Sequence, residues 1–84
     1  MSEQIDQFFA PNGTLITIPV KPAKKIAVLN RIAEKLSPGS KYTEKELNSE
    51  IVRFHADTAA IRRYMIEYGI LERDRQSNYW VSRS

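Results

Sequence analysis

The sequence contains no cysteine, and only one of its 84 residues is a histidine. The absence of thiols excludes disulfides, a thiolate nucleophile and cysteine-ligated zinc. A metal site needs three or four convergent ligands, so His55 alone is a poor basis for one, and we predict no metal and no cofactor. Because His55 lies beside Asp57, where a helix is expected to begin, we expect it to pack or hydrogen-bond within a turn.

Enzyme signatures are also missing. The sequence has neither a glycine-rich phosphate loop nor a nucleophile elbow. Its length allows one small domain, whose thin core leaves little room for a cleft that excludes water. We therefore predict that the chain is not an enzyme, and we infer no small-molecule substrate.

Long hydrophobic runs are absent as well. No apolar stretch approaches the roughly 20 residues that cross a bilayer. The first residues, MSEQIDQFF, lack the basic head and apolar stretch of a signal peptide. We expect a cytoplasmic protein with no membrane partner.

Basic residues are missing from the first 20 positions. All 13 Lys and Arg residues lie within residues 21–84, together with eight of the ten acidic residues, so this part carries a net charge of +5. The isoelectric point of the chain is about 9.4. A basic body of this kind favours nucleic acid or another anionic surface as partner, although many small soluble domains are equally basic.

Turn and periodicity signals divide the chain into an extended lead-in, residues 1–20, and a folded body, residues 21–84. The lead-in has a turn signal at Asn12-Gly13, followed by a β-branched run that predicts a strand over Thr14–Ile18. Apolar residues at helical spacing predict a first helix within Pro22–Leu36, and the SPGS segment at 37–40 ends it.

Two further helices have clear N-terminal signals. Thr43 and Glu46 form a capping box, which predicts a second helix that buries Leu47, Ile51 and Phe54. Asp57 is a suitable N-cap for a third helix, which buries Ile61, Met65 and Tyr68 and ends at Gly69.

The segments ILERD and NYWVS, around the polar RQS, predict a β-hairpin in which Trp80 fills the core beneath the wing. The break between the second and third helices, His55-Ala56, is so short that these helices must cross as in a helix-turn-helix. The predicted fold is therefore an α+β winged helix-turn-helix with three helices, a C-terminal hairpin wing and an N-terminal strand.

The motifs YTEKELN, FHAD, IRR, YGILER and NYW, in this order, resemble a small bacterial family of unknown function. Its members occur alone or fused to transcription-regulator domains of the ArsR or MerR type. The resemblance covers about Phe8 to Trp80 and implies a winged-helix-like fold. Fused members also imply an alternative, in which the module senses or binds a protein partner.

The third helix, about residues 57–68, carries two adjacent arginines that a helical projection separates. With Ile61 at the centre of the buried face, Arg63 points nearly opposite, where it could reach a phosphate or a guanine edge in a major groove. Arg62 lies at the core boundary, and we favour its packing on Ile66 and pairing with Glu46, Glu50 or Asp57 over a role in DNA binding.

The remaining candidate DNA contacts lie on the wing, about residues 70–82, and at helix starts. Arg75 is at the predicted apex of the wing, and Arg73 precedes it, with pairing to Glu72 or Asp74 as its structural alternative. The candidates at helix starts, where backbone N–H groups favour phosphate, are Lys45, Lys24 and Lys25. Thr58 of the third helix is a further candidate, for reading base edges.

We predict a DNA-binding module in transcriptional regulation, with double-stranded DNA as partner and a homodimer as one possible form. The alternative is a winged-helix protein-interaction or sensing module that binds no DNA. Its contact surface would consist of Ile66, Tyr64 and the N-terminal strand.

Overall fold

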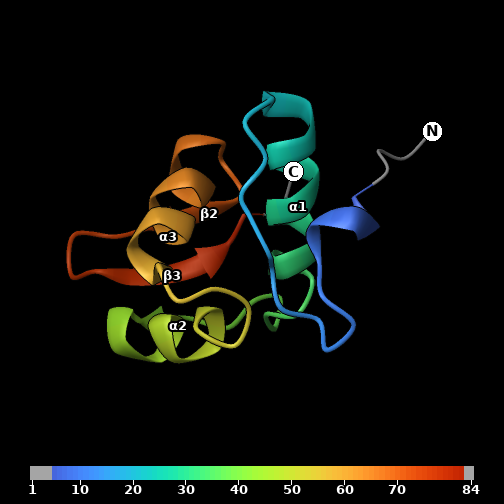
Figure 1. Ribbon diagram of the computed structural model, residues 1–84. Coiled ribbons are helices and arrows are strands. Elements are labelled where there is room, and N and C mark those ends of the chain that lie inside the picture. Colours follow the sequence, from blue (N-terminus) through green and yellow to red (C-terminus); the bar gives the residue numbers. More distant parts are fainter. Residues whose placement is uncertain (1–4, 83–84) are drawn as a thin grey trace.

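The computed structural model describes residues 5–82 of the chain (Figure 1). A short 3-10 helix, η1 (Asp6–Phe8), is followed by the helices α1 (Pro22–Ala33), α2 (Glu44–Ile51) and α3 (Thr58–Glu67). Three short strands, β1 (Tyr42–Thr43), β2 (Leu71–Arg73) and β3 (Asn78–Val81), form an antiparallel sheet in the order β1-β3-β2. The predicted α+β winged-helix architecture is confirmed, because three helices precede a C-terminal hairpin.

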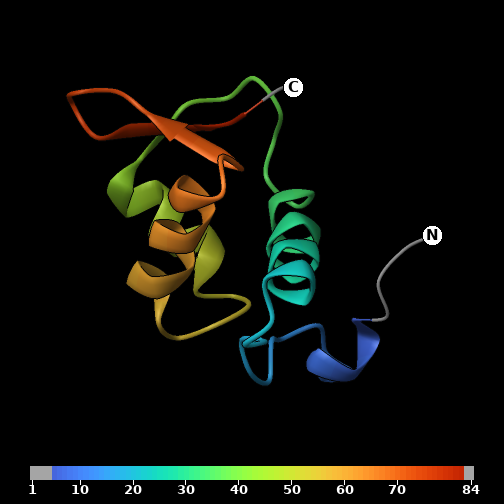
Figure 2. The same ribbon diagram turned by 90° about the horizontal axis from the view of Figure 1, so that it is seen from above.

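The helices pack on one face of the sheet, and the hairpin of β2 and β3 projects beyond them (Figures 1 and 2). One cluster of apolar side chains joins the helices, the sheet and the lead-in. Its fully covered members include Leu29 of α1, Leu47 of α2, Ile61 and Met65 of α3, and Tyr79 of β3. No helix within residues 5–82 has the length and apolar character that a bilayer crossing requires.

The predicted helix caps are confirmed. The Thr43 hydroxyl accepts from the Glu46 N–H at 3.1 Å, and the Glu46 carboxylate accepts from the Thr43 N–H at 2.8 Å, which completes the capping box of α2. The Asp57 carboxylate accepts from the Ala60 N–H at 3.1 Å and caps α3. These bonds satisfy N–H groups that have no partner inside their helices.

Gly69 ends α3 as predicted. Its φ angle is +74°, and its N–H donates to the Ile66 carbonyl at 3.1 Å. The next N–H, of Ile70, reaches back to the Met65 carbonyl at 2.8 Å. This is a Schellman motif, which turns the chain directly from α3 into β2.

The strand predicted over Thr14–Ile18 is wrong. Only Leu15 forms a single bridge, with Phe9, and the backbone of this segment bonds in several directions. The Ile16 N–H donates to the Phe8 carbonyl, whereas the Leu15 N–H donates to the Phe54 carbonyl, each at 2.7 Å. The first strand of the sheet is instead β1, immediately before α2.

The first helix lies within the range predicted for it, whereas the predicted break between α2 and α3 is too short. Regular α1 ends at Ala33, and a tighter turn continues to Leu36, whose N–H donates to the Ala33 carbonyl at 3.0 Å. The connection between α2 and α3 spans residues 52–57 and is therefore longer than the predicted break. It begins with a tight turn, in which the N–H groups of Phe54 and His55 bond to the Ile51 carbonyl.

The prediction that Trp80 fills the core is wrong, and Tyr79 occupies that place. Tyr79 is 1% exposed and pairs with Arg73 of β2 and Tyr42 of β1, on the face that meets the helices. Because side chains alternate along a strand, Trp80 points to the opposite face, where the Lys41 Nζ lies 5.1 Å from its ring centroid.

Candidate functional site

The solvent-facing stripe of α3 consists of Ala59, Arg63 and Glu67, all exposed and spaced four residues apart. Arg63 thus points outward, as the helical projection predicts. Ile66 and Tyr64, which the protein-interaction alternative requires as a contact surface, are half-buried and pack against the core. The surface that α3 offers a partner is therefore narrow and carries one cation and one anion.

Arg62 is held within the fold, as predicted, but by other partners than those predicted. Its guanidinium donates to the Asn48 side-chain oxygen and lies 4.0 Å from a Glu44 carboxylate oxygen. It also lies 5.9 Å from the ring centroid of Tyr79. These contacts join α3 to the first turns of α2 and to β3.

Arg73 reaches the neighbourhood of Arg63 because of strand register. Arg73 pairs with Tyr79, so its side chain leaves the sheet on the helix-facing side, whereas Glu72 pairs with Trp80 on the other side. The alternative that Arg73 pairs with Glu72 or Asp74 does not hold, since no ion pair within residues 5–82 includes it.

Three arginines therefore meet at one hollow between α3, the start of α2 and the hairpin, here called the arginine hollow. Its volume is about 290 Å³, and it is lined by Glu44, Ala59, Arg62, Arg63, Ile66, Arg73 and Tyr79. Glu44 is its one carboxylate, and this group already accepts from the Tyr79 hydroxyl at 2.9 Å and faces Arg62. The hollow thus has an excess of positive charge.

Glu44 and Tyr79 were not among the sequence candidates. The sequence shows that the first turn of α2 is acidic, but it does not show that the Tyr79 hydroxyl of β3 donates to Glu44.

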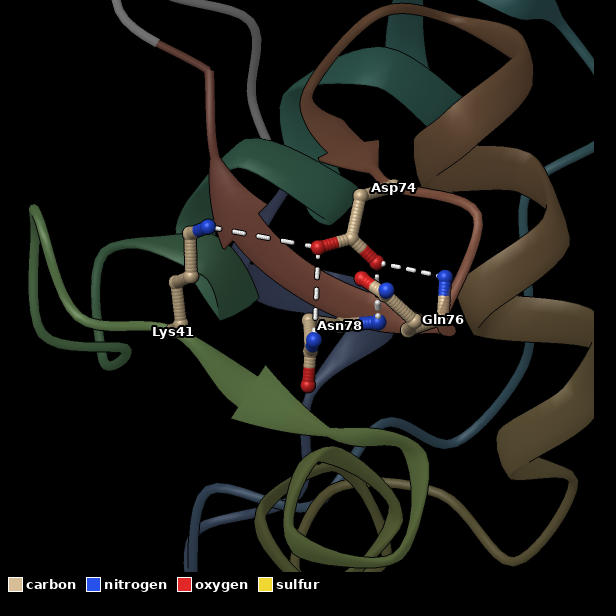
Figure 3. A network of polar contacts seen from close by, with 4 residues as sticks. All are labelled: Lys41, Asp74, Gln76 and Asn78. Carbon is tan, nitrogen blue, oxygen red and sulfur yellow. Dashed lines mark hydrogen bonds and ion pairs between the residues drawn. The ribbon is translucent and has the colours of Figure 1, made fainter.

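The wing tip is built around the carboxylate of Asp74 (Figure 3). One carboxylate oxygen accepts from the N–H groups of Gln76 and Asn78 at 2.9 and 3.0 Å, and the other accepts from the Asn78 side-chain amide at 3.2 Å. The Lys41 ammonium lies 3.9 Å from that second oxygen. Asp74 therefore closes the turn and links the wing to the segment before β1.

These contacts favour the ionised carboxylate. The backbone N–H of Asn78 is the main cause that lowers the pKa of Asp74 below its ordinary value of 3.8. Burial, the second-largest effect, raises this pKa, and the Asn78 side chain, Gln76 and Lys41 lower it. The hydrogen bonds that close the turn thus have an ionised acceptor at neutral pH, and Arg75 is exposed at the apex of the turn.

The other predicted contacts lie apart from the arginine hollow. The Lys25 Nζ lies 4.3 Å from the ring centroid of Tyr64, and its neighbour Lys24 is half-buried on α1. Lys45 and Thr58 line a separate hollow between α2 and the start of α3. The structure therefore gathers Arg62, Arg63 and Arg73, and it does not bring the lysines to them.

His55 takes the turn position predicted for it. Its Nδ1 accepts from the Asp57 N–H at 3.0 Å, next to the cap of α3. Within residues 5–82, no three His, Asp or Glu side chains converge as metal ligands would.

A family model matches residues 14–81, which include all three helices and the hairpin. Its description reads "Uncharacterized protein conserved in bacteria (DUF2087)". The chain belongs to this family. The predicted resemblance to a bacterial family without a known function is thus confirmed, whereas the fusion of relatives to regulator domains stays a prediction. Searches of curated proteins and of solved structures find no match.

Proposed function

We propose that this DUF2087 domain binds double-stranded DNA as a winged-helix module of transcriptional regulation. The supporting observation is that Arg63 of α3 and Arg73 of β2 line one hollow, although ten residues separate them in sequence. Neither side chain takes part in an ion pair within the described residues. Two cations free to bind an anion thus lie between the helix and the wing that a duplex would contact.

In this proposal α3 lies in the major groove and Arg63 reaches a phosphate or a guanine edge. Arg73 binds the backbone beside it, and Arg75 at the wing apex follows the backbone or enters the minor groove. Ala59 is too short and Glu67 has the wrong charge to add much base reading. Most of the affinity therefore comes from phosphate contacts, which position the protein and carry little sequence information.

The test is fluorescence anisotropy of a labelled mixed-sequence duplex at several salt concentrations. Three phosphate contacts would contribute about −2.7 to the slope of log K against log salt, or a loss of roughly 40-fold between about 50 and 200 mM salt. The single variants Arg63→Gln, Arg73→Gln and Arg75→Gln should each reduce the steepness of that slope by about 0.9.

The matched control is Lys35→Gln, which removes one positive charge in the turn after α1, outside the lining of the arginine hollow. If it weakens binding as much as the arginine variants do, the effect is one of net charge and the assigned interface is wrong. The stoichiometry of saturated complexes distinguishes one copy on the duplex from a homodimer.

No binding at the lowest salt, where electrostatic attraction is strongest, would refute DNA binding by this chain. The second candidate, a protein-interaction module, rests on a different observation. Ile16 and Val20 in the lead-in are 63% and 89% exposed, so both are accessible for apolar contact with a protein partner. Both candidates assign the domain a binding role and no catalytic step.

A further inference from the structure

A second hollow is lined by residues of the lead-in, of α1 and the turn after it, and of the connection between α2 and α3. In the ribbon views the lead-in runs beside α1, on the side of the molecule away from the wing tip (Figures 1 and 2). Its volume is about 480 Å³, within the usual range of small-molecule sites. It is lined by Asp6, Phe9, Ala10, Pro11, Gly13, Arg31, Ile32, Lys35 and Phe54. We call it the lead-in hollow.

The charged part of its wall is arranged to hold a carboxylate. The Arg31 Nη1 lies 2.7 Å from the Asp6 Oδ1, so the chain itself places a carboxylate on this guanidinium. The Asp6 side chain is 85% exposed and the Arg31 side chain 42%, and an ion pair this exposed contributes little to stability. A ligand carboxylate could therefore replace Asp6 on Arg31, with Lys35 as a second cation on the same wall.

The rest of the wall is apolar and aromatic. The rings of Phe9 and Phe54 both line the hollow, and the Arg31 guanidinium lies 5.2 Å from the Phe9 ring centroid. An apolar body bound here would thus contact aromatic rings beside the cation that holds its carboxylate.

Backbone hydrogen bonds fix these walls. The Ala10 N–H donates to the Thr14 carbonyl at 2.7 Å, which closes the turn at the rim. The Leu15 N–H donates to the Phe54 carbonyl at 2.7 Å, which ties the lead-in to the connection between α2 and α3. The hollow is therefore formed before any ligand arrives, which lowers the entropic cost of binding.

We propose that the lead-in hollow binds a small aromatic carboxylate, whose carboxylate takes the place of Asp6 on Arg31 and whose ring packs on Phe9 and Phe54. This site shares no lining residue with the arginine hollow, so the proposal does not rest on DNA binding. The hollow gives the module a site for an effector. One wall of this site is Phe54, which belongs to the connection between α2 and α3.

The test is an NMR titration of the 15N-labelled full chain with 2-naphthoate, with 2-naphthalenemethanol as the neutral ligand of similar shape. Naphthoate should bind with a Kd on the order of 1 mM or tighter. The largest amide shifts should fall in residues 9–14 and 31–35, and the alcohol should bind at least about tenfold more weakly.

Two variants give opposite predictions. Arg31→Gln should weaken naphthoate binding about tenfold and leave alcohol binding unchanged. Asp6→Asn removes the internal competitor and should tighten naphthoate binding about two- to fivefold, the range that a surface ion pair supplies. The matched control is Arg53→Gln, which removes an exposed charge next to Phe54 but outside the hollow and should change neither affinity.

The amide spectrum of each variant reports whether it is folded, so a loss of binding cannot be confused with a loss of structure. Equal affinity for naphthoate and for the alcohol would contradict the proposed contact between the ligand carboxylate and Arg31. Weaker naphthoate binding by the Asp6→Asn variant would contradict it as well. Shifts centred on the wing and α3, or no shifts at millimolar naphthoate, would overturn the site itself.

Discussion

The hydrogen bond between Tyr79 and Glu44 joins the wing to the start of α2, and its removal gives a sharp test of the arginine hollow. Tyr79→Phe deletes one oxygen and keeps the ring, which is 1% exposed. The variant therefore leaves core packing intact while Glu44 loses its donor at 2.9 Å. Arg62 remains near Glu44, at 4.0 Å.

The expected loss follows from the burial of the two partners. A hydrogen bond to a charged group contributes about 1.5–3 kcal/mol when both partners are enclosed. The Glu44 side chain is 49% exposed, so water can replace the phenol as donor. We therefore expect Tyr79→Phe to lower the free energy of unfolding by about 1 kcal/mol. For a domain of this size, that loss lowers Tm by about 4–8 °C.

Tyr42→Phe is the matched control. The Tyr42 hydroxyl accepts a neutral hydrogen bond of 2.8 Å from the Ser37 N–H, which lies in an exposed segment. Its removal should cost about 0.5 kcal/mol, because the bond is uncharged and water can replace it. The two variants make the same chemical change in neighbouring strands, so they compare a bond donated to a carboxylate with a bond accepted from an exposed backbone N–H.

Thermal unfolding followed by circular dichroism measures both variants, and a double-mutant cycle assigns the cause. In a Glu44→Gln background, Tyr79→Phe should lower the free energy of unfolding by less than it does in the wild type. The difference, which is the coupling energy between the two residues, should be about 0.5–1 kcal/mol. If Tyr79→Phe and Tyr42→Phe lower Tm equally, or if the cycle shows no coupling, the Tyr79–Glu44 contact does not stabilise the wing and our description of the hollow is wrong.

Three further perturbations follow from the structure. Ser77 has a φ angle of +62°, so Ser77→Gly should stabilise the domain by about 0.5 kcal/mol in urea unfolding, and a lower stability would contradict strain at this position. The fold lowers the pKa of Asp74, so its ionised form adds stability that is complete above pH 3.8 and is lost as the pH falls through the lower folded value. The wing amides should report this loss in an acid titration, and Asp74→Asn should remove that part of the pH dependence. Ile61 is 0% exposed, so Ile61→Ala should lower the free energy of unfolding, measured in urea, by about 2–5 kcal/mol. A loss below about 1 kcal/mol would contradict the place of Ile61 in the core.

The signals that the sequence reveals best are those whose cause is local. The capping box of Thr43 and Glu46, the Asp57 cap and the left-handed Gly69 each depend on backbone groups a few residues away. Such contacts form whatever the rest of the fold does, so the residue types at that spacing are sufficient to predict them. The starts of α2 and α3 are confirmed for that reason.

Pairing across the sheet cannot be predicted in the same way. The run Thr14–Ile18 has strand-like composition, but its N–H groups find partners in Phe8 and Phe54 and not in a neighbouring strand. In contrast, β1 has only two residues and is defined by its pairing with β3. Strand propensity describes a residue's fit to a sheet and does not say whether a partner is present.

The exchange of Tyr79 and Trp80 has a related cause. The side-chain period of a strand is two residues, so a shift of one residue in register moves each side chain to the other face. Size alone favours Trp80 as the core residue, but the register Arg73–Tyr79 puts Tyr79 inside. The same register directs Arg73 toward α3, which is why the arginine hollow could not be predicted from the sequence.

The two adjacent arginines of α3 therefore belong to different parts of the same site. Successive helical residues differ in direction by about 100°, which turns Arg62 toward Asn48 and Glu44 and leaves Arg63 exposed. Because Glu44 offsets the charge of Arg62, the cations available to an anion are Arg63 and Arg73, on elements that meet only when the hairpin folds against α3. An anion bound between them would bind the folded state and not the unfolded chain, so binding would stabilise the wing by mass action. The contacts of Tyr79 and Asp74 that hold the hairpin in place thus determine how well the hollow is preorganised, although neither side chain need touch the ligand.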